Sequence, residues 1–356
     1  MIIFLNTQKE NTAADKFFKA LIEKCDEKFL FIRESKKGFI SLLKISFKLK
    51  KFTKRREIEY KLIADCGCWK LFFLFFISNL WVKKIRIYTT FYHHVFNFKE
   101  CILYNQMNES WKLISLKFYK YLIAKGEIFI INFITVSEFT RNNLRKNFCI
   151  PEPNIYVIWN QIFDKEISKF EVLNKKNYSN KFDKKPSILF ITSLIKRKNI
   201  RLINKLSFVY KDRLKLVCPY TVNKKHTYIL NQLRNQKVKI FHNLNEEEIS
   251  YLYQNANCVL VPSLYEGLSL VPLEAIFNSA PLILSNIDAH NYWELPKKFY
   301  FDIYMVDELI EKLNFYLSNS RKSIDYTKYP ILMSKFKRAC IERKKNLSRI
   351  FDSNSL

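Results

Sequence analysis

Glycine is scarce in this sequence, and long apolar runs are missing. Only 4 of the 356 residues are glycine and 4 are methionine, whereas phenylalanine (32) and tyrosine (20) are abundant. No apolar run approaches the ~18 residues of a membrane-spanning helix, so an integral membrane protein is not expected. There is no internal repeat of solenoid length. The first residues, MIIFLNTQKEN, lack the pattern of a secretory signal and predict a buried strand instead.

The cysteines form neither a disulfide framework nor a zinc site. Only Cys66 and Cys68 are close in sequence, and no CxxC pair or second ligand cluster accompanies them. The other six are isolated: Cys25, Cys101, Cys149, Cys218, Cys258 and Cys340. We therefore expect reduced, buried thiols in a cytoplasmic protein.

The charge balance is strongly basic. The chain has 61 Lys and Arg against 33 Asp and Glu, a formal net charge of +28. Such an excess favours an anionic partner: nucleic acid, a phosphorylated ligand or an acidic lipid surface. The alternative is compositional, because a low-GC genome raises the lysine content of every exposed surface. Charge alone does not decide between them.

Length and pattern predict two α/β domains. The hydrophobic fraction of 48% excludes a disordered chain, and strands alternate with helices in both halves, which is typical of doubly wound parallel sheets. Residues 166–186 are polar, rich in Lys and Asn, and predict a linker. We expect an N-terminal Rossmann-like domain at 1–165, a C-terminal one at 187–328, and a basic helix at 329–356 that packs back toward the N-terminal domain.

Two segments of the first half are candidates for contact with a membrane surface. Residues 39–54 form a basic amphipathic stretch, and residues 71–82, LFFLFFISNLWV, are the most apolar run. Either segment could pack on a sheet as an ordinary helix. Alternatively, they could lie on an anionic membrane, with lysines reaching the headgroups.

The most informative segment is VLVPSLYEGLSLVPLEAIFNSAPLILSN. A predicted strand ends near Ser263, and a loop with Glu266 and Gly267 leads into a helix that carries Glu274. The free N–H groups at such a helix start are suited to a phosphate, and carboxylates suit the paired hydroxyls of a sugar or a ribose. Taken singly, Glu266 could be a solvated loop acid and Glu274 a helix-dipole acid. The strand–loop–helix context favours a ligand site.

This segment resembles the C-terminal signature of the retaining GT-B glycosyltransferases of family 4, with its E-x7-E motif at Glu266 and Glu274. Weaker likenesses are ILFITSLIKRKNI, similar to the first strand and loop of that domain, and FITVSEFTRNNL with NIYVIWNQIF, similar to the end of the N-terminal domain. The resemblance covers most of residues 130–320. It implies two Rossmann-like doubly wound parallel-sheet domains facing across a cleft.

The resemblance also implies roles for individual residues. Glu274 would bind the ribose of a nucleotide-sugar donor, Glu266 would lie beside the donor sugar, and Lys198 would neutralise the departing diphosphate. The N–H groups of four residues would hold diphosphate and sugar hydroxyls: Gly267, Leu268, Ser269 and Leu270. No cofactor and no metal would be required, because the cations do this work.

The sequence departs from the family pattern in two places. Thr192-Ser193 stands where relatives have Gly-Arg, so a diphosphate cation is missing, and Arg197 or Lys196 could replace it. The glycine-rich loop expected after the first strand is also absent, which leaves the acceptor side without a motif.

Three further positions are weaker candidates. His93 or His94 follows a strand where many relatives carry a histidine near the reacting carbon, although both could be plain loop residues. His242, with Asn243, falls where a nucleotide base could pack. Asn160 ends a strand and could instead cap a helix, while His226 and His290 carry no motif.

We therefore predict a retaining hexosyltransferase. It would move a sugar from a nucleoside-diphosphate donor to a hydroxyl of a surface glycan or lipid-linked oligosaccharide such as lipopolysaccharide or capsule. It would work peripherally on the inner face of the cytoplasmic membrane, without nucleic acid. Alternatives are a GT-B scaffold with weakened catalysis, a sugar-nucleotide epimerase, and, less favoured, a nucleic-acid-binding protein, for which no recognition motif is present.

Overall fold

The computed structural model describes residues 2–6, 13–25, 29–33, 60–65, 85–91, 129–164, 178, 181–183, 185–218 and 224–351. The chain divides into two compact units. Unit 1 comprises Met1–Asp164 with Ala339–Leu356, and unit 2 comprises Lys165–Arg338. Most of the expected linker and both candidate membrane segments, 39–54 and 71–82, lie outside the described residues.

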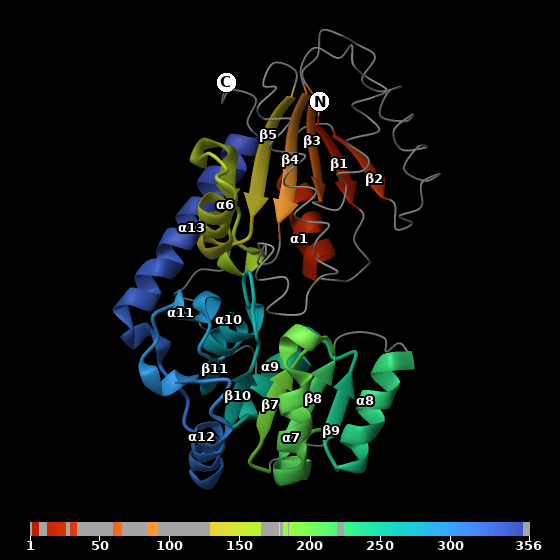
Figure 1. The fold of residues 1–356 in the computed structure, drawn as a ribbon, viewed down its shortest axis with the longest axis vertical. Helices are drawn as coiled ribbons and strands as arrows, with labels where there is room; N and C mark the ends of the chain where they lie inside the picture. Colours follow the sequence, from red (N-terminus) through yellow and green to blue (C-terminus); the bar gives the residue numbers. More distant parts are fainter. Residues whose placement is uncertain are drawn as a thin grey trace. The chain divides into compact units, whose positions relative to one another are not determined.

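Unit 1 is built on a parallel sheet with the strand order β2-β1-β3-β4-β5-β6 (Figure 1). The strands are β1 (Ile2–Asn6), β2 (Phe29–Arg33), β3 (Tyr60–Asp65), β4 (Ile85–Phe91), β5 (Phe129–Thr135) and β6 (Ile155–Val157). Two described helices accompany them, α1 (Ala13–Ile22) and α6 (Glu138–Phe148). The predicted first strand is therefore present, and Ile2, Ile3 and Phe4 are fully buried in it.

Helix α6 begins where the sequence predicts. The Ser137 hydroxyl accepts the N–H of Thr140 at 3.2 Å, which satisfies one of the free donors at the helix start. The helix ends at Cys149, which has the left-handed backbone angles φ 52° and ψ 36°. Its N–H bonds to the Arg145 carbonyl at 3.0 Å, as is common at helix ends.

Unit 2 contains a second parallel sheet, with the order β12-β11-β10-β7-β8-β9. Its strands are β7 (Ile188–Ile191), β8 (Leu214–Cys218), β9 (Lys239–His242), β10 (Cys258–Val261), β11 (Leu282–Ser285) and β12 (Tyr300–Phe301). Strands β7 to β9 extend in one direction from β7, and β10 to β12 in the other. The order therefore reverses between β7 and β10, and this is the point where ligands bind in doubly wound sheets.

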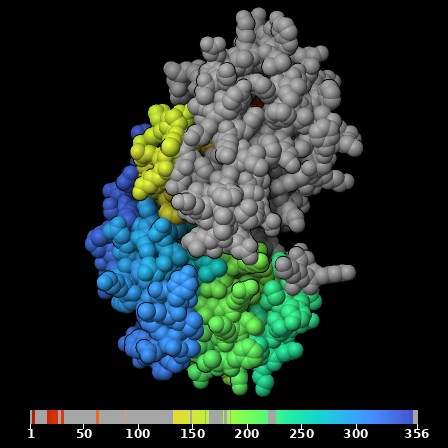
Figure 2. Space-filling view, viewed as in Figure 1, coloured from red at the N-terminus to blue at the C-terminus, as the bar shows by residue number. Residues whose placement is uncertain are grey.

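Helices lie on both faces of this sheet (Figure 1). They are α7 (Ile200–Tyr210), α8 (Lys224–Asn235), α9 (Glu246–Asn255), α10 (Leu270–Phe277), α11 (Asp288–Asn291) and α12 (Val306–Ser318). Helices α7, α8 and α12 share one core with the sheet, in which Leu206, Leu233 and Leu313 are buried. The outer surfaces of α7 and α8 are seen from the solvent side in Figure 2.

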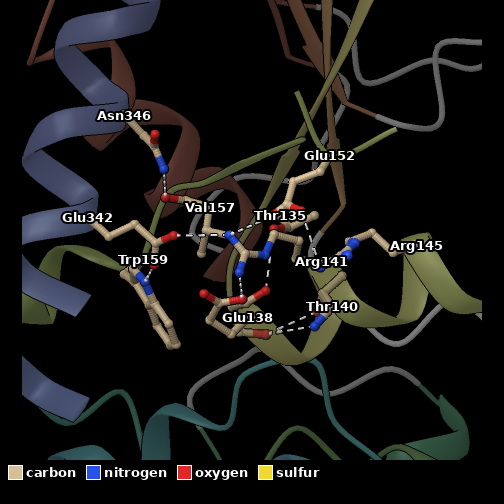
Figure 3. A network of polar contacts seen from close by, with 11 residues as sticks. Thr135, Glu138, Thr140, Arg141, Arg145, Glu152, Val157, Trp159, Glu342 and Asn346 are labelled. Atoms are coloured by element: carbon tan, nitrogen blue, oxygen red, sulfur yellow. Dashed lines mark hydrogen bonds and ion pairs between the residues drawn. The ribbon is translucent and has the colours of Figure 1, made fainter. Parts of the chain in front are cut away.

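The last helix, α13 (Pro330–Phe351), confirms the long helix expected at this position. Its first turns belong to unit 2, where the Phe336 ring packs 5.1 Å from that of Trp293. From Ala339 onward it belongs to unit 1. There Glu342 accepts the indole N–H of Trp159 at 2.8 Å, and Asn346 donates to the Val157 carbonyl at 2.9 Å (Figure 3).

Two arginines complete the polar packing of unit 1. Arg141 of α6 pairs with Glu138 at 2.6 Å and with Glu342 at 3.5 Å (Figure 3). Arg343, only 1% exposed, makes a two-pronged contact with Asp164, at 2.7 and 2.9 Å. The last turns of the chain are thus an integral part of the first unit's core.

Candidate active site

The candidate site lies at the carboxyl ends of β7 and β10 in unit 2. These two strands are parallel neighbours, so the loops that follow them, residues 192–199 and 262–269, start from the same edge of the sheet. The loops are also joined directly, because the Leu264 N–H donates to the Arg197 carbonyl at 2.8 Å. The topology therefore brings together two candidate segments that are about 70 positions apart in sequence.

Glu266 is the centre of this site. Its carboxylate is buried, with 2% of the side chain exposed, and contacts two cations: the Lys198 ammonium at 2.5 Å and the Arg197 guanidinium. The Ser263 hydroxyl donates a further bond to Glu266 Oε1 at 2.8 Å. Burial on its own would raise the pKa of Glu266. The two cations outweigh it and hold this pKa well below its usual range, so the group is a carboxylate at neutral pH.

The two cations come from one short 3₁₀ turn, Lys196–Lys198. The turn closes at Asn199, which has φ 55° and ψ 47°, a left-handed conformation that asparagine tolerates better than most residues. Arg197 and Lys198 are both mostly buried, and burial lowers the pKa of Lys198 despite the opposing effect of Glu266. Lys196 is exposed, so of the two substitutes considered for the missing arginine only Arg197 faces the site.

The start of helix α10 provides backbone donors beside this cluster. Ser269 is the N-cap residue, but its side chain does not cap the helix. Its hydroxyl oxygen is buried and has no hydrogen-bond partner among the described residues. Gly267 is buried too, and its φ is not positive. Its small size, not a left-handed backbone, is what glycine contributes here. Leu268 and Leu270 are half-buried.

Glu274 is held on helix α10 by a neighbouring helix. Its Oε2 accepts the hydroxyl of Tyr253 from α9 at 2.7 Å. Burial and the Glu274 charge together raise the pKa of Tyr253 well above its usual value, so this hydroxyl remains a donor. Glu274 is half-buried, and its charge also acts on Lys198. Both glutamates of the E-x7-E pair therefore act electrostatically on Lys198.

Ser193 and His242, which the sequence also predicts for the site, have contacts and positions different from those of the Glu266 cluster. Ser193 is half-buried, and its carbonyl accepts both the Thr192 hydroxyl at 3.1 Å and the Ile195 N–H at 2.5 Å. His242 ends β9, the edge strand that β8 separates from β7. Its Nδ1 is buried without a partner among the described residues, and the next residue, Asn243, is exposed with φ 52°.

The sequence pattern gave no indication that His290 lies near the candidate site. This residue is 1% exposed, and its Nδ1 lies 2.9 Å from the Ser285 carbonyl at the end of β11. The Ser285 hydroxyl in turn donates to the Ser263 carbonyl at 2.6 Å, next to Glu266. Burial lowers the pKa of His290 to about 4, so the imidazole is neutral at physiological pH. An isolated histidine carries no motif, and only the pairing of β10 with β11 reveals where it lies.

Other candidates fall outside the site or outside the described residues. His93 and His94 lie outside them, as do residues 7–12 of the predicted acceptor-side loop. Asn160 accepts the Ile162 N–H at 3.1 Å and so caps the short helix Gln161–Asp164. Within the described part of the chain, no group of three or more His, Cys, Asp or Glu residues could hold a metal. No described helix is both long and apolar enough to cross a bilayer.

Part of the chain resembles known glycosyltransferases. Residues 172–331 match the family described as Glycosyl transferases group 1. The chain is 26% identical to an uncharacterized glycosyltransferase of Methanocaldococcus jannaschii, over 55% of this chain and 55% of that protein. It is also 26% identical to the O-antigen chain mannosyltransferase of Salmonella typhimurium, over 43% of this chain and 42% of that protein. The chain thus spans about half the length of these relatives.

Solved structures extend the likeness over the whole fold. A UDP-forming α,α-trehalose-phosphate synthase from Burkholderia xenovorans matches with a TM-score of 0.65 and 11% identity, over 99% of this chain and 98% of that one. At this identity the likeness concerns the fold alone. It confirms the GT-B fold class expected from the sequence.

Proposed function

We propose that the chain, whose residues 172–331 match the group 1 glycosyltransferases, transfers a sugar from a nucleoside-diphosphate donor to a hydroxyl acceptor, with retention at the anomeric carbon. One observation carries the proposal. At the point where the strand order of unit 2 reverses, two mostly buried cations share a single carboxylate beside a helix N-terminus. This arrangement leaves a surplus of positive charge where a diphosphate would lie.

The donor phosphates would be held by charge and by backbone donors together. Arg197 and Lys198 supply the cations, and the first N–H groups of α10 point out of the helix start. The Ser269 hydroxyl, which has no partner among the described residues, adds a donor in the same place. Charge develops on the diphosphate as the glycosidic bond breaks, so fixed cations stabilise the transition state more than the bound donor. No metal is needed for this role.

The two glutamates would recognise the two sugars of the donor. Glu274, with one oxygen held by Tyr253, is suited to accept hydroxyls of the ribose. Glu266 is suited to accept hydroxyls of the transferred sugar. We favour attack from the same face as the departing diphosphate, which itself takes the acceptor proton, because Glu266 is bound to two cations and is a poor nucleophile in that state.

The proposed acceptor is a surface glycan or a lipid-linked oligosaccharide. Support comes from the relative named as an O-antigen chain mannosyltransferase and from the net charge of +28, which favours an anionic membrane surface. We propose a peripheral location on the inner face of the cytoplasmic membrane, which the same two points support. A mannosyl donor is the first to test.

A thermal-shift screen tests the donor site directly. The protein is heated with uridine, guanosine, cytidine or adenosine diphosphate, first without metal and then with magnesium. A nucleotide at a hundredfold its Kd adds about 2.7 kcal/mol to the free energy of unfolding, which raises Tm measurably. We expect one nucleotide to raise Tm without metal, and Glu274→Gln to reduce that shift. No shift with any nucleotide would contradict the proposal.

Turnover then separates transfer from the alternatives. A transferase consumes the sugar nucleotide faster when an acceptor is present, whereas an epimerase converts it with none. A scaffold that has lost catalysis would bind the nucleotide but show no turnover in either case.

A further inference from the structure

The carboxylate of Glu266 is bound to the same two cations that would bind a diphosphate. Its two oxygens are divided between them: Oε1 contacts Lys198 at 2.5 Å, and Oε2 contacts Arg197. All three side chains are mostly or fully buried, so water screens their interaction only weakly. The cluster carries one net positive charge in place of two.

A phosphate anion without a sugar must therefore compete with Glu266 for these two cations. To reach Arg197 and Lys198 it must displace the Glu266 carboxylate or lie next to it. Displacement leaves a buried carboxylate with the Ser263 hydroxyl as its one donor among the described residues, which is costly for a charged group. Coexistence places like charges side by side.

An intact sugar nucleotide differs from a bare diphosphate in one respect that matters here. The sugar attached to its terminal phosphate brings hydroxyl groups, and these can donate to Glu266 as the phosphates take over the cations. Each charge-assisted hydrogen bond of this kind offsets part of the cost of displacement. Once the sugar has been transferred, the remaining diphosphate has no such donors.

We propose that Glu266 is a specificity residue that disfavours diphosphates without a sugar and so promotes release of the spent nucleotide. The inference rests on the proposed transferase function. It assigns to Glu266 a role in discrimination between donor and product, in addition to contact with the donor sugar. The buried Glu266 carboxylate weakens binding of the spent diphosphate, whereas the hydroxyl groups of the donor sugar hydrogen-bond to it when the substrate is bound.

Binding of inorganic pyrophosphate tests this without any assumption about the donor sugar. Titration calorimetry is carried out with the wild-type chain, with Glu266→Gln and with Glu308→Gln as the control, an α12 carboxylate that pairs with Lys312. Removing the competing charge should tighten pyrophosphate binding by about ten- to a hundredfold. The control should stay within twofold of wild type, because Glu308 pairs with a lysine of its own helix and not with the two site cations. Unchanged or weaker binding to Glu266→Gln overturns the inference.

A measurement on the wild-type chain covers the case in which Glu266→Gln does not fold. The Kd of UDP is compared with that of UDP-glucose, and the Kd of GDP with that of GDP-mannose. The sugar nucleotide should bind at least tenfold more tightly than its own diphosphate, and Glu266→Gln, where it folds, should abolish the difference. A diphosphate that binds as tightly as its sugar nucleotide overturns this inference alone. Absence of binding by all four, with no shift from any nucleotide in the thermal-shift screen, overturns the proposed function and the inference with it.

Discussion

The two units of the chain each contain a buried ionic network, and the networks differ in their balance. In unit 1, Arg141 has Glu138 and Glu342 as partners, and Arg343 has both oxygens of Asp164. In unit 2, the Glu266 carboxylate is bound to two cations beside the start of α10, and Asp183 likewise pairs with both Lys215 and Lys239. Both networks join segments that are distant in sequence.

The difference indicates what each network is for. In the unit 1 network each arginine is paired with carboxylates of the same unit, and such pairs fasten elements together, as the contact of Arg343 in α13 with Asp164 does. A surplus cation beside a helix N-terminus is expensive to bury without an anion to compensate it. We therefore expect the Glu266 network to bind a ligand, and mutations in it and in the unit 1 network should have different effects.

The largest expected effect is on turnover, from Lys198→Met. Loss of the cation that stabilises the leaving diphosphate should lower kcat by about 100- to 1,000-fold, with a smaller change in KM. Steady-state kinetics with the donor found by the thermal-shift screen provides the measurement. Lys196→Met, which removes an exposed lysine from the same turn, is the matched control and should retain most activity. Equal losses in both variants would remove the distinction between a site network and general surface charge.

The next effect is on stability, from Arg343→Met in unit 1. The variant loses the paired contact with Asp164 and the bond to the Trp159 carbonyl, and should destabilise the fold by about 3 kcal/mol. Denaturant unfolding measures this change, with the exposed neighbour Lys344→Met as control. A change below about 0.5 kcal/mol, within the range of ordinary surface substitutions, would show that the Arg343 contacts do not fasten the last turns of α13 to the rest of unit 1.

The smallest effect is a pH dependence from His290. Its pKa is about 4 in the folded chain and near 6.5 when unfolded, so between these values the unfolded state binds the extra proton. Stability should therefore fall as the pH drops below about 6.5, by at most about 1.4 kcal/mol per pH unit. Urea unfolding at pH 7, 6 and 5 measures the slope. His290→Gln should flatten it, whereas the control His226→Gln should not. A slope that survives in His290→Gln would assign the pH dependence to other groups.

Local sequence was enough to predict the elements that carry the site. The strand before Ser263, the loop with Glu266 and the helix with Glu274 follow from hydrophobic runs and polar punctuation over about twenty residues, and the structure has them as β10 and α10. The Ser137 cap and the long C-terminal helix are confirmed for the same reason, because short-range patterns determine both. The roles assigned to Glu266, Glu274 and Lys198 stay predictions.

No local sequence pattern could predict which side chains contact each other between segments that are distant in sequence. The sequence offered both Lys196 and Arg197 as substitutes for the missing arginine. The choice depends on which way a 3₁₀ turn faces, and the structure directs Arg197 to Glu266. His290 was passed over because its connection to Ser263 runs through two neighbouring strands.

By itself, the sequence determined the alternation of strands and helices, the family resemblance and the placement of two glutamates around a helix start, since each depends on residues close together in the chain. Only the tertiary structure decided that Glu266 is the common partner of Arg197 and Lys198 and that His290 is buried beside them. The physical reason is the topology of the sheet. Strands β7, β10 and β11 are neighbours because the strand order reverses between β7 and β10, and no pattern of nearby residues records that order.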